Sequence, residues 1–127
     1  MQMKDKICII DDDPDIVEIY SIKLKNEGFE IISAPNGEIG LDKVRAEKPD
    51  LILLDILMPK KNGAEVLREL KNDPAVSKIP VIVLSNVSDD KTIEKIGSFS
   101  THFYAIKSLT TPEKISGMVK EVLYGQS

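Results

Sequence analysis

Three short runs along the chain are continuously hydrophobic and rich in leucine or β-branched residues. They cover residues 7–10, 51–54 and 81–84. An unbroken run of this length predicts a β-strand that is buried on both faces, as in a parallel sheet covered by helices. Phe29–Ser33 and His102–Ile106 are weaker candidates of the same kind. The pattern therefore predicts five strands.

Capping residues, prolines and glycines mark the helices that we expect between the strands. Asp13 followed by Pro14 is typical of an N-cap with proline at the first helical position, and Gly28 supplies a left-handed stop, so the first helix should run near Pro14–Glu27. Apolar residues at helical spacing, such as Val17, Tyr20 and Leu24, should face the core. Further helices are expected between Gly37 and Pro49, from about Gly63 to Asn72, from near Ser88 to about Ser98, and from Pro112 to a stop at Gly125.

Strands and helices thus alternate along the whole chain. Alternating units with buried strands predict an α/β fold, because right-handed crossovers place helices on both faces of a parallel sheet. We expect a doubly wound (βα)5 domain with a five-stranded parallel sheet. No linker, repeat or low-complexity stretch interrupts the pattern, so residues 1–127 are expected to form one domain.

Composition narrows the classes of function. The net charge is −4 and no run is rich in lysine or arginine, which argues against direct nucleic-acid binding. No apolar stretch approaches the roughly 18 residues of a membrane span, and no signal-peptide pattern opens the chain. The one cysteine, Cys8, lies within the first hydrophobic run and is expected to be a buried, reduced side chain. We expect a cytoplasmic protein without membrane contact.

Polar side chains follow the predicted strands where each strand ends. Asp11-Asp12-Asp13 follows the first run, Asp55 the second and Ser85 the third, and Lys107 follows the last strand. In an open α/β sheet, ligands bind beyond the carboxyl ends of the strands. One such residue is common turn chemistry, but together they predict a single polar crevice.

Three carboxylates in one crevice repel each other unless a cation lies among them. Mg2+ suits such a site because it prefers oxygen ligands and is usually shared between one or two carboxylates and a phosphate. The residues therefore predict a phosphate site with an open metal position.

Five motifs stand out along the chain: Ile9-Ile10-Asp11-Asp12-Asp13, the turn Ala34-Pro35-Asn36-Gly37, Asp55-Ile56-Leu57-Met58-Pro59 with Gly63 beyond it, Ser85, and Tyr104-Ala105-Ile106-Lys107. Together they resemble the receiver domain of response regulators in two-component signalling. The resemblance covers almost the whole chain and implies a flavodoxin-like strand order, 2-1-3-4-5.

The resemblance implies that Asp55 is the phosphoacceptor. Asp11 and Asp12 would hold Mg2+ together with Asp55 and the backbone carbonyl of Leu57, and Mn2+ would be able to take the place of Mg2+. Asp13 would cap the first helix and would not be a ligand.

The remaining family residues would bind the phosphoryl group and transmit its arrival. Ser85 and Lys107 would each contact a phosphoryl oxygen, and Ser85 and Tyr104 would act as the switch pair. The output surface would be the face formed by the fourth helix, the fifth strand and the fifth helix. The partners implied are a histidine kinase or histidine phosphotransfer protein as donor and a downstream protein or output domain. The domain would catalyse only its own phosphorylation and dephosphorylation.

Three positions depart from the family pattern. Ser108 replaces the usual proline after Lys107, so we expect a trans peptide there, because a non-proline cis bond costs about 3 to 4 kcal/mol. Asn86 stands where a small residue is usual. Leu57 cannot orient an attacking water, which predicts a slowly hydrolysing phosphorylated form.

Three alternative functions fit part of the pattern. An aspartate-nucleophile phosphatase of the haloacid dehalogenase type also uses a carboxylate, Mg2+ and lysine. That class requires an Asp-x-Asp motif, however, and here Leu57 stands where the second aspartate would be. A degenerate receiver would act only as an interaction module, which the complete set of polar residues argues against. Flavin binding is suggested by the fold alone, and the loop after the first strand lacks the expected Ser, Thr and Gly.

Overall fold

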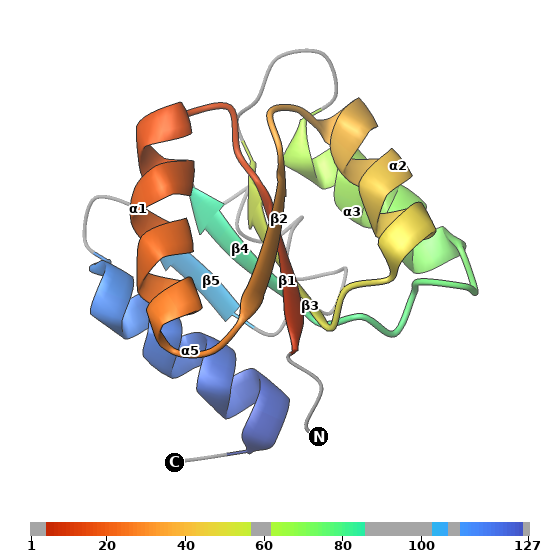
Figure 1. The fold of residues 1–127 in the computed structure, drawn as a ribbon. Helices are drawn as coiled ribbons and strands as arrows, with labels where there is room; N and C mark the ends of the chain where they lie inside the picture. Colours follow the sequence, from red (N-terminus) through yellow and green to blue (C-terminus); the bar gives the residue numbers. More distant parts are fainter. Residues whose placement is uncertain (1–4, 57–61, 86–102, 107–109, 126–127) are drawn as a thin grey trace.

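A computed structural model describes residues 5–56, 62–85, 103–106 and 110–125 (Figure 1). Strands and helices alternate from residue 6 to residue 85, as the sequence predicts. The helix expected near Ser88–Ser98 lies outside the described residues. The elements are β1 (Lys6–Ile10), α1 (Pro14–Asn26), β2 (Glu30–Ala34), α2 (Gly37–Glu47), β3 (Leu51–Asp55), α3 (Gly63–Asn72), β4 (Val81–Ser85), β5 (Phe103–Ile106) and α5 (Pro112–Tyr124).

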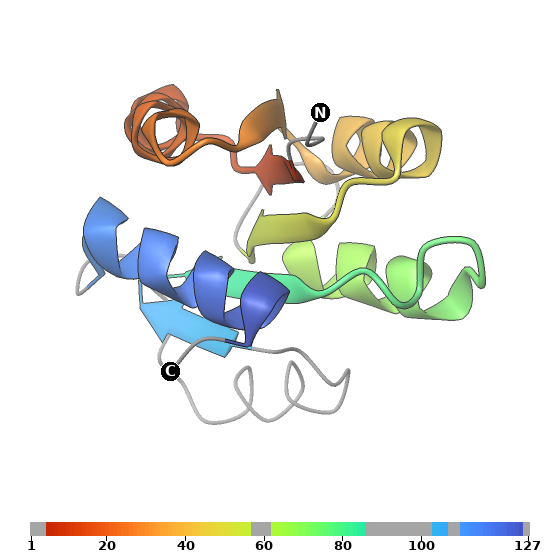
Figure 2. The same cartoon turned by 60° about the horizontal axis from the view of Figure 1, so that its bottom comes forward.

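The five strands form one parallel sheet in the order β2-β1-β3-β4-β5. This order confirms the expected doubly wound α/β fold. Helices α1 and α5 cover one face of the sheet, and α2 and α3 cover the other (Figures 1 and 2).

Strand β1 shows why the hydrophobic runs are continuous. Ile7 and Ile9 pack with side chains of α1 and α5, whereas Cys8 and Ile10 pack with side chains of α2 and α3. Both faces of the strand are therefore covered, and a polar residue on either face would lie in the core. Cys8 is buried as predicted, and burial raises the pKa of its thiol to about 12.

Most predicted helix ends are confirmed to the residue or within one. The Asp13 side chain accepts hydrogen bonds from the backbone N–H groups of Asp15 and Ile16, at 3.0 and 3.4 Å, and Pro14 opens α1. Helix α1 ends at Asn26 rather than at the predicted Glu27, which forms the C-cap before the left-handed Gly28.

Strand β2 begins one residue later than predicted. Phe29 is buried, but its N–H donates to the Leu24 carbonyl and completes the end of α1, so pairing with β1 starts at Glu30. Strand β5 covers Phe103–Ile106, and His102, the first residue predicted for it, lies outside the described residues.

Side chains of α5 fasten this helix to the rest of the domain. Glu27 at the end of α1 accepts hydrogen bonds from Ser116 at 3.2 Å and Lys120 at 3.1 Å. Farther along α5, the Tyr124 hydroxyl donates to Asp5 at 2.5 Å. These bonds hold α5 against α1 and the start of β1.

Within the described ranges, no helix combines the length and the hydrophobicity that crossing a membrane would require.

Candidate functional site

The central strands β1 and β3 carry the acidic residues to one edge of the sheet. In the parallel register, Ile10 of β1 lies opposite Leu54 of β3. Asp11 and Asp55 follow these residues directly, so both carboxylates lie at the carboxyl edge of the sheet. This is the location that the sequence predicts for the polar crevice.

The carboxylates of Asp11, Asp12 and Asp55 form a compact cluster. One oxygen from each residue lies within 4.8 Å of those from the other two. Asp11 and Asp55 are only 3% and 5% exposed, whereas Asp12 is exposed. The cluster therefore has two buried members and one that faces the solvent.

The donor set of this cluster fits a small hard cation. Mg2+ binds oxygen at about 2.1 Å in an octahedron, so neighbouring ligand oxygens lie about 3.0 Å apart and opposite ones about 4.2 Å apart. The oxygens of the cluster lie within 4.8 Å of one another and would draw together around an ion, a movement for which the exposed Asp12 has room. Three oxygen ligands also leave positions for water and phosphate.

The turn between β1 and α1 holds the acidic residues in different orientations. The backbone N–H of Asp13 donates to Asp11 Oδ1 at 2.9 Å, which fixes the Asp11 carboxylate beside the turn. The Asp13 carboxylate instead caps α1 through Asp15 and Ile16. Consecutive aspartates thus contribute to the carboxylate cluster and to the helix cap separately.

Two further site predictions fall on the described backbone. Ser85 is the last residue of β4 and lies opposite Ile106 of β5, one position beyond the pair formed by Asp55 and Leu84. Tyr104 lies in β5 opposite Val83. Both residues are therefore on the strands that continue the sheet beyond β3.

The other predictions lie outside the described residues. These are Leu57, which follows Ile56 directly, Asn86, which follows Ser85, and Lys107, which follows Ile106, together with the expected trans peptide between Lys107 and Ser108.

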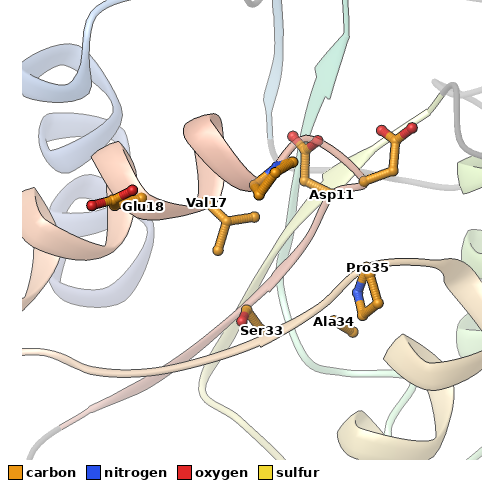
Figure 3. Close-up of a pocket in the computed structure, with 8 residues that line it drawn as sticks. Asp11, Val17, Glu18, Ser33, Ala34 and Pro35 are labelled. Carbon is orange, nitrogen blue, oxygen red and sulfur yellow. The ribbon is translucent and has the colours of Figure 1, made fainter.

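A pocket next to the acidic cluster was not expected from the sequence. Its volume is about 260 Å³, and it lies between the start of α1 and the end of β2 (Figure 3). Pro14, Val17, Ala34 and Pro35 give it mainly apolar walls. The Asp11 carboxylate points away from Val17 and Ala34 (Figure 3). The pocket thus borders the acidic cluster, and Asp11 and Asp12 are among the residues that line it.

Gly63 contacts the end of β3, a contact that the sequence motif alone does not reveal. It is the first residue of α3, and its N–H donates to the Ile56 carbonyl at 2.8 Å. The start of α3 therefore lies directly against the end of β3, which carries Asp55.

The sequence is similar to that of a bacterial transcriptional regulator. PhoP of Bacillus subtilis, the alkaline phosphatase synthesis transcriptional regulatory protein, is 32% identical over 122 residues, which cover 95% of this chain and 49% of PhoP. The chain thus spans about half the length of this transcriptional regulator.

Solved structures of response regulators have the same fold. The phosphorylated cyanobacterial phytochrome response regulator RcpA is 28% identical, with a TM-score of 0.87 over 98% of both chains. The Mn2+-bound form of the response regulator Rcp1 is 25% identical, with a TM-score of 0.84 over 97% of both chains.

The match to a family extends over most of the sequence. The model of the response regulator receiver domain matches residues 7–120, a range that includes the acidic cluster and every element of the sheet from Ile7 onward. Both the fold and the order of the motifs agree with this match. The chain belongs to the response regulator receiver domain family.

Proposed function

We propose that residues 1–127 form one receiver domain, which accepts a phosphoryl group on Asp55 in a Mg2+-dependent reaction. The observation that carries this proposal is the convergence of Asp11, Asp12 and Asp55 at the carboxyl edge of a receiver fold. In a doubly wound sheet this edge is the usual place for a ligand.

The burial of the cluster explains why it suits a divalent cation. Asp11 and Asp55 are nearly inaccessible, so their negative charges are poorly screened by water. Asp11, Asp12 and Asp55 would hold Mg2+ together with the carbonyl of Leu57. Mn2+ is expected to substitute, which agrees with the Mn2+-bound form described for the relative Rcp1. When bound, the ion would neutralise charge on the phosphoryl oxygens.

Asp55 is the proposed acceptor because it lies at the end of the central strand β3. One carboxylate oxygen would form a bond to phosphorus while the bond from phosphorus to the donor nitrogen breaks. No general base is needed, since an ionised carboxylate has no proton to lose. Ser85, one position beyond the residue opposite Asp55, would donate its hydroxyl to a phosphoryl oxygen, and Lys107 would bind another. The relative RcpA is known in a phosphorylated form, which supports the same chemistry here.

The donor and the output follow from the same arrangement. A histidine kinase or histidine phosphotransfer protein would supply the phosphoryl group. Its arrival adds charge and acceptor oxygens at the end of β3. Ser85 would then move toward the new oxygens and Tyr104 would turn inward. The signal would leave through the face formed by the fourth helix, β5 and α5, toward a downstream protein or an output domain.

The proposal is tested by incubating the protein with MgCl2 and acetyl phosphate and weighing the intact chain. The wild type should gain the mass of one phosphoryl group, and EDTA should prevent the gain. Asp55→Asn keeps the shape of the side chain and should gain nothing, whereas Asp42→Asn, an exposed aspartate of α2, should behave as the wild type. A wild type that stays unmodified, or an Asp55→Asn chain that is modified equally, would contradict the proposal.

A further inference from the structure

The first residue of α3 lies unusually close to the end of β3. The N–H of Gly63 donates to the Ile56 carbonyl at 2.8 Å, and Gly63 itself is buried. Residues 57–62 connect these two positions in the sequence. One hydrogen bond therefore joins the start of α3 to the residue that directly follows Asp55.

A side chain at position 63 would collide with the backbone of β3. A Cβ atom on Gly63 would lie 2.5 Å from the carbonyl oxygen of Asp55 and 2.6 Å from Ile56 Cα. Real Cβ atoms essentially never come within 3.0 Å of another heavy atom in this way. Backbone atoms cannot rotate aside as a side chain can, so the end of β3 or the start of α3 would have to move.

Backbone conformation does not explain why position 63 is a glycine. Among the glycines that the structure describes, only Gly28 and Gly125 have a positive φ. The backbone of Gly63 is one that alanine adopts readily, and alanine favours a helix more than glycine does. The requirement at position 63 is therefore one of space.

We infer that Gly63 is a positioning residue for the phosphoacceptor. Its missing side chain lets α3 approach closely enough to hold the backbone of Asp55 and Ile56, and so to hold the Asp55 carboxylate beside Asp11 and Asp12. This inference rests on the proposed phosphorylation of Asp55. An ordinary contact begins at 3.4 Å, so an alanine requires position 63 and the Asp55 carbonyl to separate by 0.9 Å from their 2.5 Å approach. Misplacement of a reacting group by about 1 Å can lower a rate by about 100-fold.

Two other glycines provide matched controls. A Cβ on Gly40 of α2 would lie 2.7 Å from Ile10 Cδ1, and its nearest atoms all belong to the Ile10 side chain. This crowding occurs beside β1, one residue before Asp11, but a side chain can absorb it. A Cβ on Gly117 of α5 would have no neighbour within 4 Å. Alanine at that exposed helical position should stabilise the fold.

The experiment compares Gly63→Ala, Gly40→Ala and Gly117→Ala with the wild type. Mn2+ affinity is measured from the electron paramagnetic resonance signal of the free ion. The phosphorylation rate with acetyl phosphate is measured at saturating Mn2+, and stability is measured by urea unfolding. Gly63→Ala should weaken Mn2+ binding by about tenfold or more, as outer contacts of metal ligands do, and slow phosphorylation by about 100-fold. Gly40→Ala should lose stability but keep both site properties within about twofold.

The outcomes separate this inference from the proposed function. A wild type that neither binds Mn2+ nor becomes phosphorylated would overturn both. A functional wild type with Gly63→Ala no worse than Gly40→Ala in affinity and rate would overturn only the role of Gly63. If Gly63→Ala does not fold, the same measurements are made on the double variant with Gly117→Ala. A double variant that still does not fold would also overturn the inference, because the glycine would then serve the fold and not the site.

Discussion

The acidic cluster predicts that removing one of its charges stabilises the metal-free protein and reduces the stabilisation that Mg2+ provides. Asp12→Asn is the perturbation of choice, because Asp12 is the exposed member and asparagine has nearly the same shape. Without a divalent cation the variant should be more stable than the wild type. With Mg2+ the wild type should gain much more stability than the variant.

The size of the stabilisation expected without metal follows from the spacing of the carboxylates. Oxygens of Asp12 lie within 4.8 Å of those of Asp11 and Asp55. At 4.8 Å two like charges repel by about 1 kcal/mol in water and by about 3.5 kcal/mol at an effective dielectric constant of 20. Asp12 takes part in two such pairs and faces the solvent, so the water end of this range applies. Asp12→Asn should therefore raise the free energy of unfolding of the metal-free protein by about 1 to 2 kcal/mol.

Mg2+ should stabilise the wild type more than it stabilises Asp12→Asn. A ligand at about 100 times its dissociation constant stabilises a protein by about 2.7 kcal/mol. If the lost carboxylate weakens binding about tenfold, the same Mg2+ concentration stabilises the variant by only about 1.4 kcal/mol. The gain of the wild type on adding Mg2+ should thus be about twice that of Asp12→Asn.

The assay is urea unfolding followed by far-ultraviolet circular dichroism, because the chain has no tryptophan. Each protein is unfolded once in EDTA and once in MgCl2. Asp42→Asn makes the same chemical change on α2, outside the acidic cluster, and should respond to Mg2+ as the wild type does. An Asp12→Asn protein that is less stable than the wild type in EDTA would refute the repulsion argument. Equal stabilisation by Mg2+ would refute the role of Asp12 as a ligand.

Three further predictions concern the fold that supports the site. Asp13→Ala should lower the free energy of unfolding by about 1 kcal/mol because it removes the cap of α1, whereas Asp13→Asn should stay close to the wild type in urea unfolding. Equal losses would contradict the cap. Leu67→Ala should cost about 2 to 5 kcal/mol in the same assay, because Leu67 is fully buried; a loss below about 1 kcal/mol would mean that the core is loosely packed there. The hydrogen bond from Lys120 holds the pKa of the Glu27 carboxyl below its ordinary value of 4.5. The stability that ionised Glu27 provides is therefore complete above pH 4.5 and is lost as the pH falls through the lowered pKa. The urea midpoints of the wild type and Glu27→Gln should therefore converge from pH 7 to pH 3, and a constant difference would exclude this linkage.

The sequence predicted the acidic cluster because two simple rules act together. Buried parallel strands appear as unbroken hydrophobic runs, and polar residues that follow such runs gather at one edge of the sheet. Asp11 and Asp55 meet both conditions, and their strands are neighbours in the structure. Neighbouring strands do not follow from the pattern itself, however. The order 2-1-3-4-5 came from the family resemblance.

Contacts between distant segments were beyond the reach of local patterns. Glu27 and Lys120 are 93 residues apart, and either could equally be a solvated surface charge. The requirement for Gly63 depends on how closely α3 approaches the carbonyl of Asp55, which is a property of packing. The late start of β2 has a similar origin, because Phe29 completes the end of α1 before pairing with β1 can begin.

Locating the phosphoryl group on the chain tests the central claim most directly. After incubation with MgCl2 and acetyl phosphate, sodium borohydride reduces an aspartyl phosphate to homoserine, which marks the modified residue for peptide mapping by mass spectrometry. The account predicts homoserine at position 55, formed with Mg2+ and not in EDTA. Homoserine at Asp11 or Asp12, or labelling of Asp55 that persists without a divalent cation, would contradict it.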